Sequence, residues 1–342
     1  MLKKKSLGSF VDVDVSRRTR KSKFFYQINT VIDWSVFEKE LYKVCKRSIQ
    51  DAAGRPAYNP LVLFKMMLIQ TWYNLSDMGV EDMVNDTLSA NLFCGLRVED
   101  TVPDHSTLSR FRSELAEKKA MNRLLHKLNV QLTNQGIMVQ NGGIIDASIT
   151  PTLHKPKGKS TYMLPNSCGV PPEKTVQPGV DKEGKWVKKG GKLQYGYKRH
   201  YLSEDKEGLV LSVHTTGGNV HDSQCMEACL DQVCLPARSR ILADKGYCSS
   251  KNEELLKSRG LRSGIQKKAR RNRPLSKWEK SYNRYISRSR YKIERVFGSI
   301  KRWFGRLEAR YVGLSKTHNQ HVLEAIAYNL YRLPGIIMSN AG

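Results

Sequence analysis

Apolar positions recur at helical spacing through residues 31–135, and this pattern predicts several short helices. The segment "YNPLVLFKMMLIQTWYNL" places Asn59 at a helix N-cap and Pro60 at the first helical position. A later helix, capped by Asp104 or Ser106, presents Arg110 and Arg112. Short helices that end in a polar, arginine-bearing helix are typical of helix-turn-helix-like DNA readers, although many small helical bundles share the pattern.

The pattern changes after residue 142, where short apolar runs predict strands. "GGIIDAS" is a strand that ends near Asp146, and "SRILADKGYCS" is a buried strand that ends at Asp244. Two strands flank the turn "DKEG" and predict a β-hairpin. Residues 151–192 are rich in Pro, Gly and Lys without a period, which predicts a long basic loop.

Helices alternate with these strands. "HDSQCMEACLDQV" begins with Asp222 or Ser223 as its cap, "KNEELLKSRG" is closed by Gly260, and a last helix ends before Pro334. A three-stranded meander followed by α/β units predicts a mixed sheet with helices on its faces. We therefore divide the chain into a basic arm (1–30), a helical DNA-binding domain (31–135) and an α/β domain (136–336).

Charge narrows the choice of partner. Lys and Arg number 58 against 32 Asp and Glu, a net charge of +26. Such an excess indicates a polyanionic partner, whose phosphates release counterions when cationic side chains bind. We expect no membrane association because the sequence contains neither a long apolar stretch nor an export signal. The seven cysteines match no zinc pattern and are expected to be free thiols, so a cytoplasmic nucleic-acid-binding protein is predicted.

Candidate chemistry lies at the strand ends. Asp146 and Asp244 both follow apolar strands, and ligands of open α/β sheets bind at that edge. Two neighbouring carboxylates repel each other unless cations lie between them, and hard oxygen ligands suit Mg²⁺ or Mn²⁺. Asp222 is a reserve carboxylate, which either approaches the metal site or caps the helix after it.

The basic segment "YKIERVFGSIKRWFG" contains one acid, Glu294. At about 100° per residue, Arg290, Glu294 and Lys301 fall within about 40° of one another and form one polar row beside an apolar stripe. Two interpretations follow. Either Glu294 joins the aspartates while Arg290 and Lys301 face a phosphate backbone, or all three are a surface row of ion pairs.

These residues resemble a signature of bacterial insertion-sequence transposases of the DDE class. In one branch the signature is Tyr-x2-Arg-x3-Glu-x6-Lys, matched by Arg290, Glu294 and Lys301, whereas Ser287 stands at the Tyr position. "ADKGY" matches a second element at Asp244, Gly246 and Tyr247, and "GGIIDAS" matches the first catalytic Asp at Asp146. The helical N-terminal region is also similar to that of this branch.

The resemblance implies a ribonuclease-H-like α/β catalytic domain preceded by an all-α N-terminal domain. It further implies a DNA transposase that binds terminal inverted repeats, cleaves the ends and joins them to target DNA. Asp146, Asp244 and Glu294 would hold two Mg²⁺ or Mn²⁺ ions, with Asp222 and Tyr247 as possible contributors. Double-stranded DNA would be the partner of a homodimer. The rival functions are a related nuclease without strand joining and a non-catalytic DNA-binding protein.

Overall fold

The computed structural model describes residues 19–45, 57–158, 161–163, 173–175, 178–305 and 308–341. Within these residues, the helices before the first strand are α2 (Arg20–Val31), α3 (Trp34–Val44), α4 (Pro60–Trp72), α5 (Asp77–Asp86), α6 (Leu88–Cys94), α7 (His105–Glu117) and α8 (Met121–Asn134). The predicted helical character of residues 31–135 is therefore confirmed for the described residues. Residues 1–18 of the predicted basic arm (1–30) lie outside the described part of the chain. The prediction of an arm is wrong for residues 20–30, because they belong to α2, which buries Phe25 and Ile28 in the core.

Side-chain N-caps fix the first residues of α4 and α7 at the positions that the sequence predicts. The Asn59 side chain accepts from the Leu61 N–H at 2.8 Å, and Pro60 is the first residue of α4. Asp104, rather than Ser106, caps α7 by accepting from the Thr107 N–H at 2.7 Å. These bonds satisfy backbone donors that have no partner inside the helix.

The sheet has a parallel core with antiparallel strands on one side. The three parallel strands extend to one edge of the sheet. The strands are β1 (Gly142–Pro151), β4 (Lys185–Lys189), β5 (Lys192–Glu204), β6 (Val210–Gly217), β7 (Arg240–Ala243) and β8 (Arg262–Ile265). The order is β4-β5-β1-β7-β8, and β6 pairs with β5 beyond the end of β4. β1, β7 and β8 are parallel to one another, whereas β5 is antiparallel to β1. The predicted mixed sheet is confirmed, as is the hairpin made by β5 and β6.

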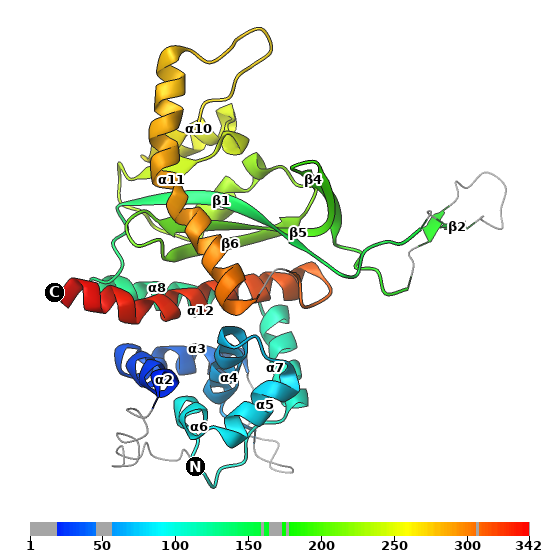
Figure 1. The fold of residues 1–342 in the computed structure, drawn as a ribbon, viewed down its shortest axis with the longest axis vertical. Coiled ribbons are helices and arrows are strands. Elements are labelled where there is room, and N and C mark those ends of the chain that lie inside the picture. The colour runs from blue at the N-terminus through cyan, green and yellow to red at the C-terminus, as the bar shows by residue number, and fades with distance from the viewer. Residues whose placement is uncertain are drawn as a thin grey trace.

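Short helical segments and two long helices complete the domain: η1 (Asp222–Gln224), α9 (Met226–Leu230), η2 (Lys245–Tyr247), α10 (Ser250–Ser258), α11 (Lys277–Phe304) and α12 (Leu314–Ala341). α11 and α12 pack on the face of the sheet that carries Tyr201. The Tyr201 ring stacks on Phe297 of α11, and its hydroxyl donates to the His321 carbonyl of α12. Figure 1 shows the sheet above α8 and α12, with α2 to α7 below them.

One apolar core joins the N-terminal helices to the sheet through α12. α12 contacts α2, α4, α7 and α8 on one side and β6 on the other. The indole Nε1 of Trp72 donates to the Ala327 carbonyl at 3.0 Å, so α4 is bonded directly to α12. Burial along both sides explains why α12 is long and largely apolar.

Sequence expectations about the secondary structure of two further segments are wrong. The segment 151–192 is not loop throughout: it contains β4, and the short strands β2 (Thr161–Met163) and β3 (Glu173–Thr175) form a separate pair. Pairing with β5 stabilises β4 despite its lysine-rich sequence. The last helix does not end before Pro334 but continues through it, because Leu333 and Ile336 remain buried on the same side of α12.

Candidate active site

Asp146 and Asp244 lie side by side where the pairing of β1 with β7 ends, although β1 itself continues past Asp146 to Pro151, paired with β5. β1 and β7 are parallel with Ile145 opposite Ala243, so the next residue of each chain segment is an aspartate at the same edge. Asp244 leaves the strand and caps the η2 turn, where its Oδ1 accepts from the Gly246 N–H at 2.8 Å. The predicted pairing of these two carboxylates at one sheet edge is what the backbone register produces.

Arg290 of α11 is bonded to the first of these aspartates. Its Nη2 lies 2.7 Å from Oδ2 of Asp146, and the two side chains are only 12% and 17% exposed. Burial raises the pKa of Asp146, and the negative charge of Asp244 raises it further. The Arg290 charge and the Ala147 N–H act in the opposite direction. Burial is the largest of these influences, so the pKa of Asp146 is raised in spite of Arg290.

Glu294 lies on the segment of α11 that crosses this site. It stands four residues after Arg290, which bonds to Asp146, and three residues before Phe297, which stacks on Tyr201. Tyr201 is the partner of Asp146 in the β1–β5 register. Glu294 itself is exposed. In the described residues, no three Asp, Glu, His or Cys side chains are gathered closely enough to form a ready metal cluster.

Asp222 lies near the same edge but has a different partner. Lys198 of β5 donates to Asp222 Oδ1 at 2.9 Å and to the Val220 carbonyl at 2.7 Å. The expectation that Asp222 caps the following helix is wrong, because His221 is the cap residue of η1. A Cβ added at Gly246 would lie 2.8 Å from Asp244 Oδ1 and 3.5 Å from Asp222 Oδ2. The two carboxylates are thus neighbours, with Lys198 neutralising one of them.

Tyr247 anchors the turn that carries Asp244. Its hydroxyl lies 3.1 Å from Nδ1 of His200, whose Nε2 lies 3.3 Å from Thr216. Burial lowers the pKa of His200 to about 3, so this imidazole is neutral. Tyr247 is fully buried, and burial raises its pKa well above the usual value. We assign Tyr247 a structural role beneath the carboxylates.

Lys198 is a neighbour of this site that no sequence motif indicates. The residue lies on the antiparallel strand β5, opposite Ile149 of β1. Only the fold brings its ammonium group to Asp222, 24 positions later in the chain. Lys301 lies further along α11 than Glu294 and is partly buried.

A profile of the family described as "Transposase DDE domain" matches residues 138–330, and one described as "Transposase domain (DUF772)" matches residues 13–114. The chain belongs to the DDE transposase family. It is 35% identical over 225 residues to the transposase for insertion sequence element IS1106 of Neisseria meningitidis serogroup B, covering 65% of this chain and 76% of that protein. The resemblance inferred from the motifs is confirmed.

Among solved structures, this transposase aligns with a piggyBac transposase synaptic complex with hairpin DNA. That match has a TM-score of 0.40 and 11% identity, and covers 95% of this chain and 77% of that one. A pre-cleavage Mos1 transpososome aligns with a TM-score of 0.22 and 8% identity, over 98% of this chain and 99% of that one.

Arg110 and Arg112 occupy different environments in the transposase. Arg110 is exposed on α7 and donates to the Ser106 and Thr107 hydroxyls at 3.2 and 3.3 Å. Arg112 is 6% exposed and bonds to Asp77 at 2.7 Å and Gln70 at 3.3 Å. Its guanidinium joins α7 to α4 and α5, so the predicted DNA contact of Arg112 is wrong. The spacing of residues in the sequence could not show which face of α7 is buried.

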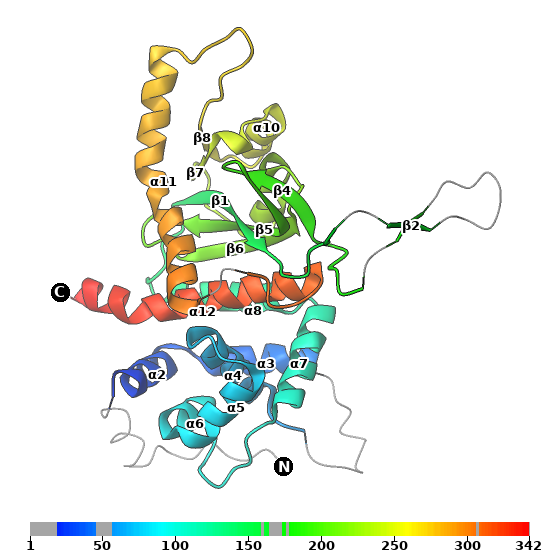
Figure 2. The ribbon, with the colours of Figure 1, turned by 45° about the vertical axis from the view of Figure 1, so that its right-hand side comes forward.

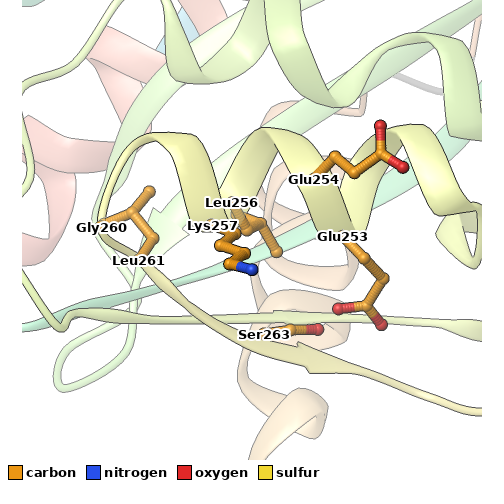
Figure 3. Close-up of a pocket in the computed structure, with 7 residues that line it drawn as sticks. All are labelled: Glu253, Glu254, Leu256, Lys257, Gly260, Leu261 and Ser263. Carbon is orange, nitrogen blue, oxygen red and sulfur yellow. The ribbon is translucent and has the colours of Figure 1, made fainter.

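A concave surface lies elsewhere on the transposase, between α10 and β8. Figure 3 shows its lining residues: Glu253, Glu254, Leu256, Lys257, Gly260, Leu261 and Ser263. None of the candidate carboxylates lines this pocket. None of the described helices is long and apolar enough to cross a lipid bilayer.

Proposed function

We propose that this chain binds the terminal inverted repeats of an insertion sequence, cleaves the ends and joins them to target DNA. The observation that carries the proposal is the adjacent pair Asp146 and Asp244, placed by the β1–β7 register in a chain with a net charge of +26. The strand order, with one antiparallel strand beside a parallel core, supports a ribonuclease-H-like catalytic domain.

The chemistry of the donors fits divalent metal ions. Two hard carboxylates lie side by side, and the negative charge of one raises the pKa of the other, a cost that a cation would remove. We assign Asp146, Asp244 and Glu294 as the residues that would hold two Mg²⁺ or Mn²⁺ ions. Such ions, when bound, activate the attacking oxygen and stabilise the leaving oxygen of a phosphodiester.

Glu294 completes this set by changing position relative to the aspartates. It is exposed and lies on the stretch of α11 between the residue bonded to Asp146 and the residue stacked on Tyr201. We propose that its side chain turns toward the sheet edge when metal ions bind, which leaves the buried apolar face of α11 in place. Asp222 remains a reserve, because Lys198 already neutralises it.

Arg290 has two roles in this proposal. In the protein alone it neutralises Asp146, and its Nε has no hydrogen-bond partner among the described residues. When DNA enters, a backbone phosphate offers the guanidinium an alternative anion and releases Asp146 for the metal. Entry of the substrate would thereby be coupled to assembly of the metal site.

The DNA-binding surface would extend along the first half of α11 and the loop before it. Ten Lys or Arg residues and one acid, Glu279, lie between Lys267 and Arg290. Figure 2 shows the first half of α11 and the loop before it standing above the sheet edge. Exposed Arg110 and this basic segment would contact phosphates, whereas base contacts would determine end recognition. We propose that two copies of the chain hold the two ends.

Cleavage of a labelled duplex that carries the inverted repeats flanking the gene tests the proposal. We expect Mg²⁺-dependent cuts by the wild type, none by Glu294→Gln, and wild-type cuts by Glu227→Gln, a matched change in an exposed ion pair. DNA binding should persist in all three proteins. Normal cleavage by Glu294→Gln would remove this residue from the site.

A second assay separates the rival functions. Pre-cut ends are incubated with target DNA, and joined products are counted. Cutting without joining identifies a nuclease of the same fold, whereas metal-independent binding with neither reaction identifies a non-catalytic DNA-binding protein.

A further inference from the structure

Gln266 continues the row of residues that the parallel strands present at the active-site edge of the sheet. Ile265, the last residue of β8, is opposite Ala243 of β7. Gln266 therefore occupies the position beside Asp244, on the flank opposite Asp146. Its N–H donates to the Ala243 carbonyl at 3.0 Å, which fixes the residue at this edge. Strand register alone brings Gln266 to the site, because no motif in the sequence indicates it.

The Gln266 amide joins α11 to the first aspartate through Arg290. Its Nε2 donates to Ser287 Oγ at 2.7 Å and to the Asn283 carbonyl at 3.1 Å, while Oε1 accepts from Nη1 of Arg290 at 3.5 Å, the long limit of a hydrogen bond. A carbonyl only accepts and a guanidinium only donates, so these partners fix which way the amide points. Nη2 of the same guanidinium is bonded to Asp146 at 2.7 Å. A continuous chain of contacts thus connects β8, α11 and β1.

The end of β8 also docks α11 onto the sheet. The Asn283 side chain pairs with both backbone groups of Lys267: it accepts from the N–H at 2.8 Å and donates to the carbonyl at 2.9 Å. At about 100° per residue, four positions of α11 fall within about 60° of one another: Asn283, Ser287, Arg290 and Glu294. The bonds at the first two positions therefore set the rotation and the axial position of α11 for the last two.

An amide suits this place because it is neutral. It gives the guanidinium of Arg290 an acceptor but adds no negative charge beside Asp146 and Asp244. A carboxylate at position 266 would repel the two aspartates and would compete with a DNA phosphate for the guanidinium. An apolar side chain would leave Nη1 without this acceptor, and Nε of Arg290 already lacks a partner among the described residues.

We propose that Gln266 is a positioning residue, which holds one end of the Arg290 guanidinium while the other end exchanges Asp146 for a DNA phosphate. Ser287 and Asn283 support this role by holding the amide in place. The inference rests on the proposed function and adds to it a residue of β8 that lies outside the transposase motifs. Ser287 gains a role here as well, although it departs from the tyrosine of the signature.

A double-mutant cycle on DNA binding tests this role. Affinity for a labelled duplex with a pre-cut inverted-repeat end is measured by fluorescence anisotropy without divalent metal, so the readout does not depend on catalysis. We expect Gln266→Leu to weaken binding several-fold in the wild-type background but to have little effect in the Arg290→Ala background, because the guanidinium that it positions is then absent. Ser287→Ala should show the same pattern with a smaller loss, and Ser287→Thr, which retains the hydroxyl, should bind as the wild type does.

Gln232→Leu is the matched control. Gln232 is buried to a similar degree, and its amide donates to the Val213 and Ala228 carbonyls at 3.0 and 2.9 Å, neither of which belongs to α11. Its replacement removes two comparable amide bonds, so it should lower Tm about as much as Gln266→Leu does. It should nevertheless leave DNA affinity unchanged in both backgrounds.

An equal loss from Gln266→Leu in both backgrounds would show that Gln266 acts independently of Arg290. Either that result or wild-type affinity of Gln266→Leu refutes this inference and leaves the proposed function intact. If Gln266→Leu does not fold, the cycle with Ser287→Ala decides in the same way, since Ser287 is exposed. Failure of the wild type to bind the end DNA would refute the proposed function as well.

Discussion

The buried ion pair between Arg199 and Glu324 offers a direct test of how the sheet is held to α12. Arg199 lies on β5 and Glu324 on α12, and their side chains are 0% and 1% exposed. Nε and Nη2 of Arg199 have no hydrogen-bond partner among the described residues. Glu324→Gln keeps the shape of the side chain but leaves the guanidinium charge uncompensated in the core.

Glu324→Gln should lower the free energy of unfolding strongly, because the buried guanidinium of Arg199 cannot reach water. Removing one partner of a buried pair costs about 3–5 kcal/mol, against a total stability of about 5–15 kcal/mol for folded proteins. With an unfolding entropy of about 2.1 cal/mol/K per residue, a chain of 342 residues loses about 4–7 °C in Tm. One continuous core joins the sheet to the helices, so we expect a single transition.

Differential scanning calorimetry of the wild type, Glu324→Gln and Glu227→Gln measures this loss. Glu227 pairs with Lys251 at the surface, with side chains 47% and 77% exposed, and its change should cost less than about 1 kcal/mol. The double variant Arg199→Met with Glu324→Leu should recover most of the loss, since it removes both charges. A Glu324→Gln protein that melts within about 1 °C of the wild type would refute the reasoning.

Two further changes probe the carboxylate site. Arg290→Gln should raise the pKa of Asp146 further, because the opposing charge is lost, and should move the acidic limb of the cleavage rate to higher pH. A carboxyl pKa raised by folding favours stability at low pH, so Arg290→Gln should destabilise the protein less at acidic than at neutral pH in urea titrations. Asp222→Asn should cost about 1–3 kcal/mol by removing the Lys198 partner, yet retain cleavage that Asp244→Asn abolishes. Equal loss of cleavage in both variants would place Asp222 in the metal site.

Several features were predictable because they depend on neighbours in the chain. The N-caps Asn59 and Asp104 form bonds within three residues, and their helices begin where the sequence predicts. The apolar runs before Asp146 and Asp244 form strands as predicted, although β1 does not end near Asp146 but continues to Pro151. The adjacency of the two aspartates also follows, because parallel strands share a carboxyl edge.

The sequence by itself determined the family, the carboxylates at the strand ends and the polar row on α11, since each rests on local periodicity or a short motif. Tertiary structure alone decided that Arg112 is buried against Asp77, that Lys198 neutralises Asp222, and that Gln266 bonds to Arg290. These contacts join residues between 24 and 35 positions apart. Their partners are chosen by strand register and helix packing, whose free energy is shared across the whole core rather than stored in any one segment.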